Sequence, residues 1–289
     1  MRLSDNETHN AMKKFGLIGH PIAHSLSPAL FKAAYDGKYP YDLIEEDDFE
    51  KACDRFLKEY DAINVTAPFK ENAYRKADIK SPGCEAIGAA NILIRLPDGK
   101  IYADNSDQMG VAGAVAAGLD PDRRPVADAL VVGCGGAAKA AAYAMCCSGY
   151  NTVIINRNLE KARDFAQKLS ANTDFSIHAA SLDDFHRCFR KAGVIIYTLP
   201  VLIPSICSLS RADIRGGILM RKDKIIVEAN YKDPAFSQEM ISRLEAVNPG
   251  LRYVSGKEWL LHQAVGAYRA FTGEDPDIQR MRTAFSPTL

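Results

Sequence analysis

The chain has 289 residues, 47% of them hydrophobic, and its 36 basic residues balance 36 acidic ones. This length suits two domains better than one, and the charge balance excludes a bulk field that would attract nucleic acid or an anionic membrane. Seven scattered cysteines without a CxxC pair favour reduced thiols in a cytoplasmic protein with no metal site. The polar N-terminus and the lack of an apolar run of about 20 residues predict neither secretion nor membrane insertion.

The first part of the chain alternates predicted strands and helices. Strands are expected at 14–19, in YDLIEE and in DAINV, and helices from Ser27-Pro28 to Tyr35, over 48–59 and over 71–77. Serine is the predicted N-cap of the first helix, with proline at its first position. The stretch NILIRLPDGKIYADN predicts a hairpin that turns at Pro97-Asp98-Gly99. This rhythm is typical of a mostly parallel α/β sheet.

A second α/β unit begins with a helix after Asp107. The pattern predicts strands over 129–133, 152–156, 194–199 and 224–228, and helices over 137–148 and 159–169. Two final helices are predicted over 256–272 and after Pro276. The residue patterns do not decide on which half they pack.

A glycine-rich turn follows the first strand of this second unit. In VVGCGGAAKAAAYAM, Gly133, Gly135 and Ala138 form a G-x-G-x-x-A pattern between a strand and a helix, which is the context of a dinucleotide-binding turn. Gly133 permits the turn and Gly135 lets backbone N–H groups approach a pyrophosphate, while Gly136 and Ala137 open a helix whose N-terminus favours an anion. A purely structural turn is the alternative.

The end of the next strand distinguishes the two nicotinamide cofactors. NAD sites usually place an acidic residue there to hold the ribose 2′-hydroxyl, but this strand ends in Asn156-Arg157-Asn158, with Lys161 one turn later. A guanidinium matches the oxygens of a 2′-phosphate, so Asn156, Arg157 and Lys161 predict NADP as the cofactor. A solvated arginine is the alternative for Arg157.

Three polar loops follow predicted strand ends in the first half, namely HSLS (24–27), NVTAPFK (64–70) and DNSD (104–107). Loops at the carboxyl ends of parallel strands converge on one crevice. Together with Asn91 on the hairpin, they suit a small polyhydroxylated acid. Each also has a structural explanation, because Ser27 can cap a helix, Asn64 and Thr66 can shape a turn, and Asp104 can form an Asx turn.

Between residues 15 and 270 the chain resembles the shikimate dehydrogenases, in the ordered motifs GHPIAHSLSP, NVTAPFK, GAAN, DNSD, GCGGAAKA, NRN and HQA. The resemblance implies a substrate domain and a Rossmann NADP-binding domain with a cleft between them. It implies catalytic roles for Lys70 and Asp107. The expected substrate contacts are Ser25, Ser27 and Tyr231 for a carboxylate, and Asn64, Thr66, Asn91 and Gln263 for ring hydroxyls.

The implied organisation is a substrate-binding and catalytic domain over 1–107, an NADP-binding domain over 108–254, and C-terminal helices over 255–289 that return to the first domain. The implied reaction interconverts 3-dehydroshikimate and shikimate in aromatic amino-acid biosynthesis, with a homodimer as candidate assembly. Two alternatives stay open: a relative that acts on quinate or another cyclic hydroxy acid, and a weakly catalytic NADP-binding module. Lys70 is either the proton acceptor or a group that positions the substrate through its charge.

The chain departs from the usual motifs at four places. Gln108 follows the DNSD stretch where glycine is usual, and we expect it to narrow the substrate pocket. The stretch 197–202 (YTLPVL) lacks the glycine that the family commonly has in the loop near the nicotinamide. The stretch GKEWLLHQA (256–264) has bulkier side chains than the family's usual motif, and Asn158 replaces the family's usual threonine. These changes concern specificity and rate rather than fold.

Overall fold

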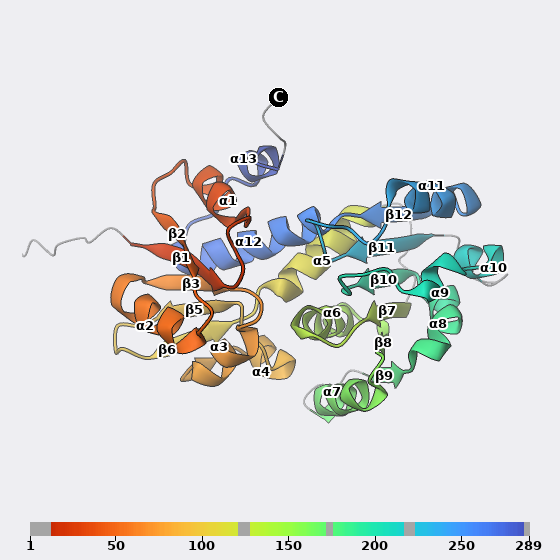
Figure 1. Cartoon of the computed structure of the whole chain (residues 1–289), viewed down its shortest axis with the longest axis horizontal. Helices are drawn as coiled ribbons and strands as arrows, with labels where there is room; N and C mark the ends of the chain where they lie inside the picture. Colours follow the sequence, from red (N-terminus) through yellow and green to blue (C-terminus); the bar gives the residue numbers. More distant parts are fainter. Residues whose placement is uncertain (1–12, 121–127, 172–175, 217–222, 286–289) are drawn as a thin grey trace, which may run out of the picture.

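The structure is a computed structural model that describes residues 13–120, 128–171, 176–216 and 223–285. Two six-stranded sheets lie side by side, one built from the first part of the chain and one from the later part (Figure 1). Two helices, one from the middle of the chain and one near its end, run between them.

The first sheet has the strand order β2-β1-β3-β5-β6-β4. Its strands are β1 (Phe15–Gly19), β2 (Tyr41–Glu45), β3 (Ala62–Val65), β4 (Ile79–Lys80), β5 (Ile92–Arg95) and β6 (Ile101–Asp104). β1 pairs in parallel with β2 and β3, and β4 pairs in parallel with β6, whereas β5 is antiparallel to both of its neighbours. The expected hairpin is therefore β5–β6, inside a sheet of mainly parallel pairs.

Four helices accompany this sheet, α1 (Ser27–Ala34), α2 (Phe49–Glu59), α3 (Lys70–Lys76) and α4 (Pro82–Ile87). α2 forms where an amphipathic pattern meets a good cap, because the Asp48 side chain accepts hydrogen bonds from the N–H groups of Glu50 and Lys51. Its apolar side packs on Ile44 and Ile63 of the sheet. Residue patterns did not predict α4 or the short β4.

The predicted serine cap of α1 is wrong in position. The helix begins at Ser27 itself, and its cap residue Leu26 makes no side-chain capping bond. Ser25 takes that role, because its Oγ accepts a hydrogen bond from the Ser27 N–H at 3.2 Å. The Ser27 hydroxyl is therefore left for other side chains.

The second sheet is parallel throughout and has the order β12-β11-β10-β7-β8-β9. Its strands are β7 (Asp128–Val132), β8 (Asn151–Ile155), β9 (Ile177–Ala180), β10 (Val194–Tyr197), β11 (Lys224–Glu228) and β12 (Leu251–Val254). β7 comes first in the chain and lies in the middle of the sheet. The chain then adds β8 and β9 toward one edge, and afterwards β10, β11 and β12 toward the other edge. The strand order thus reverses between β7 and β10, where doubly wound sheets bind their ligands.

The helices of this unit are α6 (Gly136–Cys147), α7 (Leu159–Ala171), α8 (Phe185–Lys191), α9 (Pro204–Cys207), α10 (Arg211–Arg215) and α11 (Gln238–Val247), with a 3-10 turn η1 (Leu182–Asp184). The predictions included α6 and α7 but not the later helices, nor β9 and β12. Both faces of the sheet are covered: α6 and α7 contribute to one apolar core, and α8, α9, α10 and α11 to the other.

The helices α5 (Asp107–Gly118) and α12 (Gly256–Thr272) run side by side between the two sheets (Figure 1). Two glycines of α5 allow their close approach. A Cβ at Gly110 would lie 2.8 Å from the backbone oxygen of Trp259, and one at Gly113 would lie 2.2 Å from the ring of His262. Side chains larger than hydrogen at these positions would push the two helices apart.

The end of the chain completes the core of the first sheet. Leu261, Tyr268 and Phe271 of α12 are buried against β1 and α1, and the Phe271 ring stacks on Phe15 at 5.3 Å between centroids. Met281 of α13 (Ile278–Thr283) is fully buried in the same cluster. The face of the first sheet that carries Phe15 is thus covered by the most C-terminal described helices.

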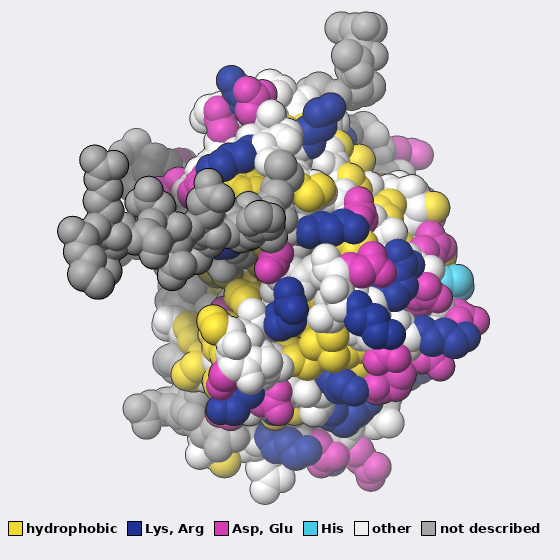
Figure 2. Space-filling model, turned by 90° about the vertical axis from the view of Figure 1, so that its left-hand side faces the viewer, with side chains coloured by type: hydrophobic (Ala, Val, Ile, Leu, Met, Phe, Trp, Pro, Cys, Tyr) yellow, Lys and Arg dark blue, Asp and Glu magenta, His cyan; other side chains and the backbone are white. Residues whose placement is uncertain are grey.

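Basic and acidic side chains are interspersed on the outer face of the first-sheet half (Figure 2). This mixture agrees with the balance of charges in the sequence. Among the described residues, no helix combines the length and the apolar character that crossing a membrane requires.

Candidate active site

The predicted polar residues of the first half meet at one edge of the first sheet. β1, β3 and β6 end there, and β5 begins there, because Asn64 of β3 and Asp104 of β6 both lie opposite Ile92 of β5. The loops that carry Ser25, Asn64, Asn91 and Asp107 therefore open toward the same side. The residues converge because β5 runs antiparallel to both of its neighbours. It therefore begins at the sheet edge where β3 and β6 end.

Lys70 and Asp107 form an ion pair with 2.5 Å between Nζ and Oδ2. Each is the first residue of a helix, Lys70 in α3 and Asp107 in α5. The Asp107 side chain is 6% exposed and that of Lys70 is 21% exposed, so the aspartate is buried while the lysine side chain still reaches solvent.

Backbone segment 89–91 holds both members of the pair in place. The Ala90 N–H donates to the Lys70 carbonyl at 2.9 Å. Asn105 donates from Nδ2 to the Ala89 carbonyl at 2.8 Å and accepts from the Asp107 N–H at 3.0 Å. Asn105 is fully buried, so these bonds are shielded from water.

The two predicted carboxylate-binding serines lie together. The Ser25 hydroxyl lies 3.2 Å from the Ser27 hydroxyl, and Tyr268 of α12 donates to the Ser27 carbonyl at 3.1 Å. Tyr231 approaches from the loop after β11: burial raises the pKa of its phenol, and a hydrogen bond from the Leu26 backbone opposes that rise. The second unit thus brings Tyr231 to the serine loop of the first.

The predicted hydroxyl-binding amides form a connected series. Asn64 donates to the Asn91 carbonyl at 3.3 Å, and Asn91 donates to Gln263 Oε1 at 3.0 Å. Asn91 also accepts from the Ser106 N–H at 2.8 Å, and both asparagines are buried. Thr66, which is partly buried, packs its methyl group toward Gly19, where a Cβ would lie 2.4 Å from Thr66 Cγ2.

Tyr41 belongs to this series, although residue patterns did not single it out. Its hydroxyl donates to Asn64 Oδ1 at 2.8 Å. Tyr41 is the first residue of β2. The residues around it predict only a strand, so no sequence pattern marks Tyr41 as a functional residue. Its partner lies on β3, two strands away across β1.

The glycine turn lies where the sequence placed it. Gly133 has φ +115°, a conformation that side chains rarely adopt, and a Cβ there would lie 2.4 Å from Thr198 Oγ1. Gly135 is the exposed N-cap of α6, and a Cβ there would meet nothing within 4 Å. The turn thus offers an open approach to backbone at a helix N-terminus, which fits a pyrophosphate.

The start of α6 lies against α3, which carries the predicted catalytic lysine. A Cβ at Gly136 would lie 3.8 Å from Lys70 Cδ and 3.9 Å from the Ala89 Cβ. One turn further along α6, Lys139 lies 3.6 Å from the Glu71 carboxylate. The helix predicted to bind cofactor phosphates therefore begins beside the side chain of the predicted catalytic lysine.

The residues predicted to recognise a 2′-phosphate follow β8. Arg157 and Lys161 are both exposed, and Asn156 donates to the Asn158 carbonyl at 2.9 Å. Asn158 accepts from the Lys161 N–H at 3.0 Å, which is a helix-capping bond at the start of α7. The unusual Asn158 thus performs a capping task that threonine also performs.

Two other departures have clear positions. Gln108 lies against α4, since a Cβ at Gly83 would lie 2.8 Å from its Nε2; its bulk therefore occupies the α4–α5 contact rather than the predicted position in the substrate pocket. After β10, the buried Tyr197 hydroxyl donates to the Val201 carbonyl at 2.5 Å and accepts from the Ile203 N–H at 3.0 Å. This tyrosine shapes the loop that lacks glycine, and burial raises its pKa to about 12.

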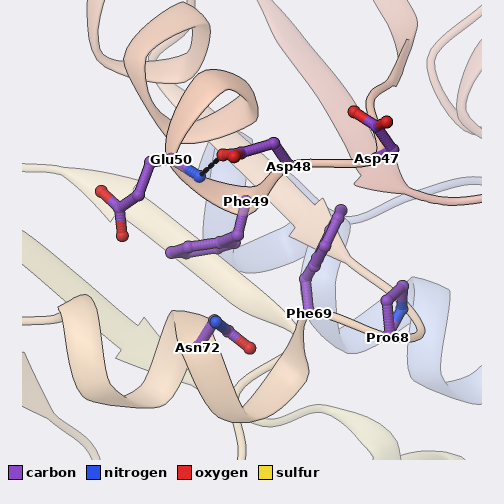
Figure 3. A pocket seen from close by; sticks show the side chains of 7 residues that line it. All are labelled: Asp47, Asp48, Phe49, Glu50, Pro68, Phe69 and Asn72. Carbon is purple, nitrogen blue, oxygen red and sulfur yellow. Dashed lines mark hydrogen bonds between the residues drawn. The ribbon is translucent and has the colours of Figure 1, made fainter.

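A separate hollow of about 370 Å³ lies beside the loop that precedes Lys70 (Figure 3). It is lined by Asp47, Asp48, Phe49, Glu50, Pro68, Phe69 and Asn72. The Phe49 and Phe69 rings lie 5.7 Å apart between centroids, with their planes tilted by 55° (Figure 3). None of the predicted site residues lines this hollow, so it is distinct from the site that contains Lys70 and Asp107.

Comparisons with known proteins agree with this arrangement. A shikimate dehydrogenase substrate binding domain matches residues 17–93, and a shikimate / quinate 5-dehydrogenase family matches residues 122–200. The chain is 32% identical over 278 residues to the shikimate dehydrogenase (NADP(+)) of Caulobacter vibrioides, with 90% of each chain covered.

It is 30% identical to the shikimate dehydrogenase (NADP(+)) of Ignicoccus hospitalis, with 91% of this chain and 94% of that one covered. Among solved structures, shikimate 5-dehydrogenase from Thermus thermophilus in complex with NADP(H) and shikimate is similar, with a TM-score of 0.76 at 26% identity. That match covers 94% of this chain and 98% of the other.

Proposed function

Since the chain belongs to the shikimate dehydrogenase family, we propose that it interconverts 3-dehydroshikimate and shikimate with NADP as its cofactor. This reaction would serve aromatic amino-acid biosynthesis. The observation that carries the proposal is the position of the Lys70–Asp107 pair, with Lys70 against Gly136 at the start of the cofactor helix. A hydroxyl held by Lys70 would lie beside the place where a dinucleotide binds.

The chemistry of alcohol oxidation explains why such a pair is needed. When bound, NADP⁺ accepts the hydride that leaves the carbinol carbon. The hydroxyl proton must leave in the same reaction, so a group that accepts or relays a proton has to contact that oxygen. The Lys70 side chain is 21% exposed and would make this contact, while its ion pair with the buried Asp107 carboxylate keeps Nζ in place.

The remaining contacts give the pocket its selectivity. Ser25 and Ser27, with Tyr231 opposite, offer hydroxyls to a carboxylate at one end. Asn64, Thr66, Asn91 and Gln263 offer amide and hydroxyl groups to ring hydroxyls. The two serine hydroxyls lie within hydrogen-bond distance of each other, and Asn64, Asn91 and Gln263 are joined through hydrogen bonds.

The glycine turn and the loop after β8 supply the cofactor contacts. Gly133, Gly135, Gly136 and Ala137 would hold the pyrophosphate, and Asn156, Arg157 and Lys161 would hold the adenosine 2′-phosphate. The open approach at Gly135 and the exposed basic side chains fit an anion. In the division that we propose, residues 1–107 and 255–289 form the substrate unit, and residues 108–254 form the cofactor unit.

The cytoplasmic location and the homodimer stay predictions. Seven unpaired cysteines, five of them buried, support a reducing compartment. Light scattering of the purified protein would test the homodimer.

The proposed activity is tested by following NADPH formation with purified protein, first with shikimate and then with quinate, each with NADP⁺ and NAD⁺. Turnover of shikimate with NADP⁺ is the expected result. Preference for quinate would assign the chain to the related cyclic hydroxy acid, and NADP binding without turnover of either acid would make it a binding module.

Replacing Arg157 with alanine is expected to weaken NADP⁺ binding about tenfold or more, since one charge-assisted phosphate contact is lost. NAD⁺, which has no 2′-phosphate, should be affected far less. The measurement is the KM of each cofactor at saturating shikimate. Lys168→Ala, on the same helix as Lys161, is the control, and equal losses for both cofactors in the Arg157 variant would contradict the phosphate contact.

A further inference from the structure

The Tyr41 hydroxyl holds one of the amides of the proposed substrate pocket. It donates to Asn64 Oδ1 at 2.8 Å. Burial raises the pKa of the Tyr41 phenol, so the hydroxyl keeps the proton that it donates to Asn64.

The Tyr41 bond determines how the Asn64 carboxamide is oriented. Asn64 is 5% exposed, and its Nδ2 donates to the Asn91 carbonyl at 3.3 Å. Since Nδ2 donates to a carbonyl oxygen, rotating the amide by half a turn would place Oδ1 against the Asn91 carbonyl, two acceptors with no hydrogen between them. The one remaining Nδ2 hydrogen and the free Oδ1 lone pair are therefore fixed in direction.

The Tyr41 ring is itself held from two sides. It packs on Phe31 of α1 at 4.7 Å and on Tyr268 of α12 at 6.0 Å between ring centroids. These contacts use the ring and leave the hydroxyl for Asn64. The phenylalanine variant would keep the packing and lose only the hydroxyl.

We propose that Tyr41 is a positioning residue for substrate binding, which holds the Asn64 carboxamide in the direction that a cyclic hydroxy acid requires. This inference rests on the proposed function, because it assumes that Asn64 contacts the substrate. Tyr41 acts through Asn64 and takes no part in proton transfer. Its loss therefore weakens binding of substrate and transition state alike.

The test compares Tyr41→Phe with wild type. The KM for shikimate is expected to rise about tenfold, whereas kcat changes less than about threefold and the KM for NADP⁺ is unchanged, because uniform binding affects KM alone. On an Asn64→Ala background, Tyr41→Phe should add less than about twofold, since residues that act through one another are not additive. If Tyr41 had only a general structural role, Tyr41→Phe would raise the KM on the Asn64→Ala background by the same factor as in the wild type.

The matched control is Tyr35→Phe. Tyr35 is buried beside the same Phe31, at 5.2 Å between ring centroids, but its hydroxyl bonds to the Glu274 carbonyl and to Thr272. It removes a buried phenol from the same aromatic cluster without touching Asn64 or Ser27. The KM for shikimate should stay at the wild-type value.

Calorimetric titration with shikimate, in parallel with the assay, separates failure of the inference from failure of the proposed function. An active wild type with an unchanged KM in Tyr41→Phe would overturn the inference and leave the function standing. If the wild type binds shikimate without oxidising it, the proposed function fails, and a roughly tenfold weaker dissociation constant in Tyr41→Phe still supports the inference. Absence of shikimate binding by the wild type overturns both.

Discussion

Replacing Lys70 with alanine should lower kcat for shikimate oxidation by about 100- to 10,000-fold, the range for loss of a group that transfers a proton. Lys70 is the only partner recorded for the Asp107 side chain among the described ion pairs, at 2.5 Å. NADP⁺ binding should be retained, because Gly136 meets only the aliphatic part of the Lys70 side chain. The measurements are NADPH formation and calorimetric titration with NADP⁺.

Lys76→Ala is the matched control for this prediction. Lys76 lies at the other end of α3 and forms an exposed ion pair with Glu50 at 2.7 Å, so its loss should leave turnover unchanged. A Lys70→Arg variant then separates the two roles of Lys70, because arginine keeps the positive charge but does not accept a proton at neutral pH. Full turnover in Lys70→Ala would remove Lys70 from the mechanism.

The second large effect is expected for Gly133→Ala. The alanine would have to adopt φ +115° and would place its Cβ 2.4 Å from Thr198 Oγ1. Backbone strain and overpacking together should lower the free energy of unfolding by about 2–4 kcal/mol. Displacing Thr198 also breaks its bond to the Val132 carbonyl at 2.8 Å. Thermal denaturation and NADP⁺ titration measure the two consequences.

Gly135→Ala provides the contrast, because a Cβ there meets nothing within 4 Å and the backbone is extended. This variant should unfold at the wild-type temperature yet bind NADP⁺ more weakly, since the new methyl group occupies the approach of the pyrophosphate. Equal stability of the Gly133 and Gly135 variants would contradict the strain at Gly133, and wild-type NADP⁺ affinity in Gly135→Ala would contradict the site.

Much of the fold could be predicted from residue patterns because the elements that carry the site have strong local signals. The glycine turn between β7 and α6, the strand ends that carry Asn64 and Asp107, and the hairpin β5–β6 are all found as expected. The family, the two-domain α/β fold and the NADP cofactor of the relatives agree with the motifs.

Several of the missed elements have weak local signals. α4, α9 and α10 are each six residues or shorter, too short for a helical period to stand out. The edge strands β9 and β12 have only four residues each. Their formation depends on pairing with β8 and β11, which no local pattern contains.

The same limit applies to the site. Ser25, Lys70 and Asp107 lie in motifs, whereas Tyr41 becomes relevant only when β1 brings β2 and β3 to its two sides. The helix-capping role of Ser25 was likewise assigned to Ser27, since two serines two residues apart offer the same local signal. Gln108 was expected in the substrate pocket because its neighbour Asp107 is there, but on α5 consecutive side chains point in different directions.

The return of α12 to the first sheet also sets an order of events during synthesis. The strands of the first sheet leave the ribosome early, yet Phe15 and Phe31 gain their partners Tyr268 and Phe271 only when the end of the chain has been made. All strands of the second sheet have emerged by then. Of the two halves, the one proposed to bind the substrate is therefore translated first and closes its core last, and until then its aromatic face lacks the partners from α12.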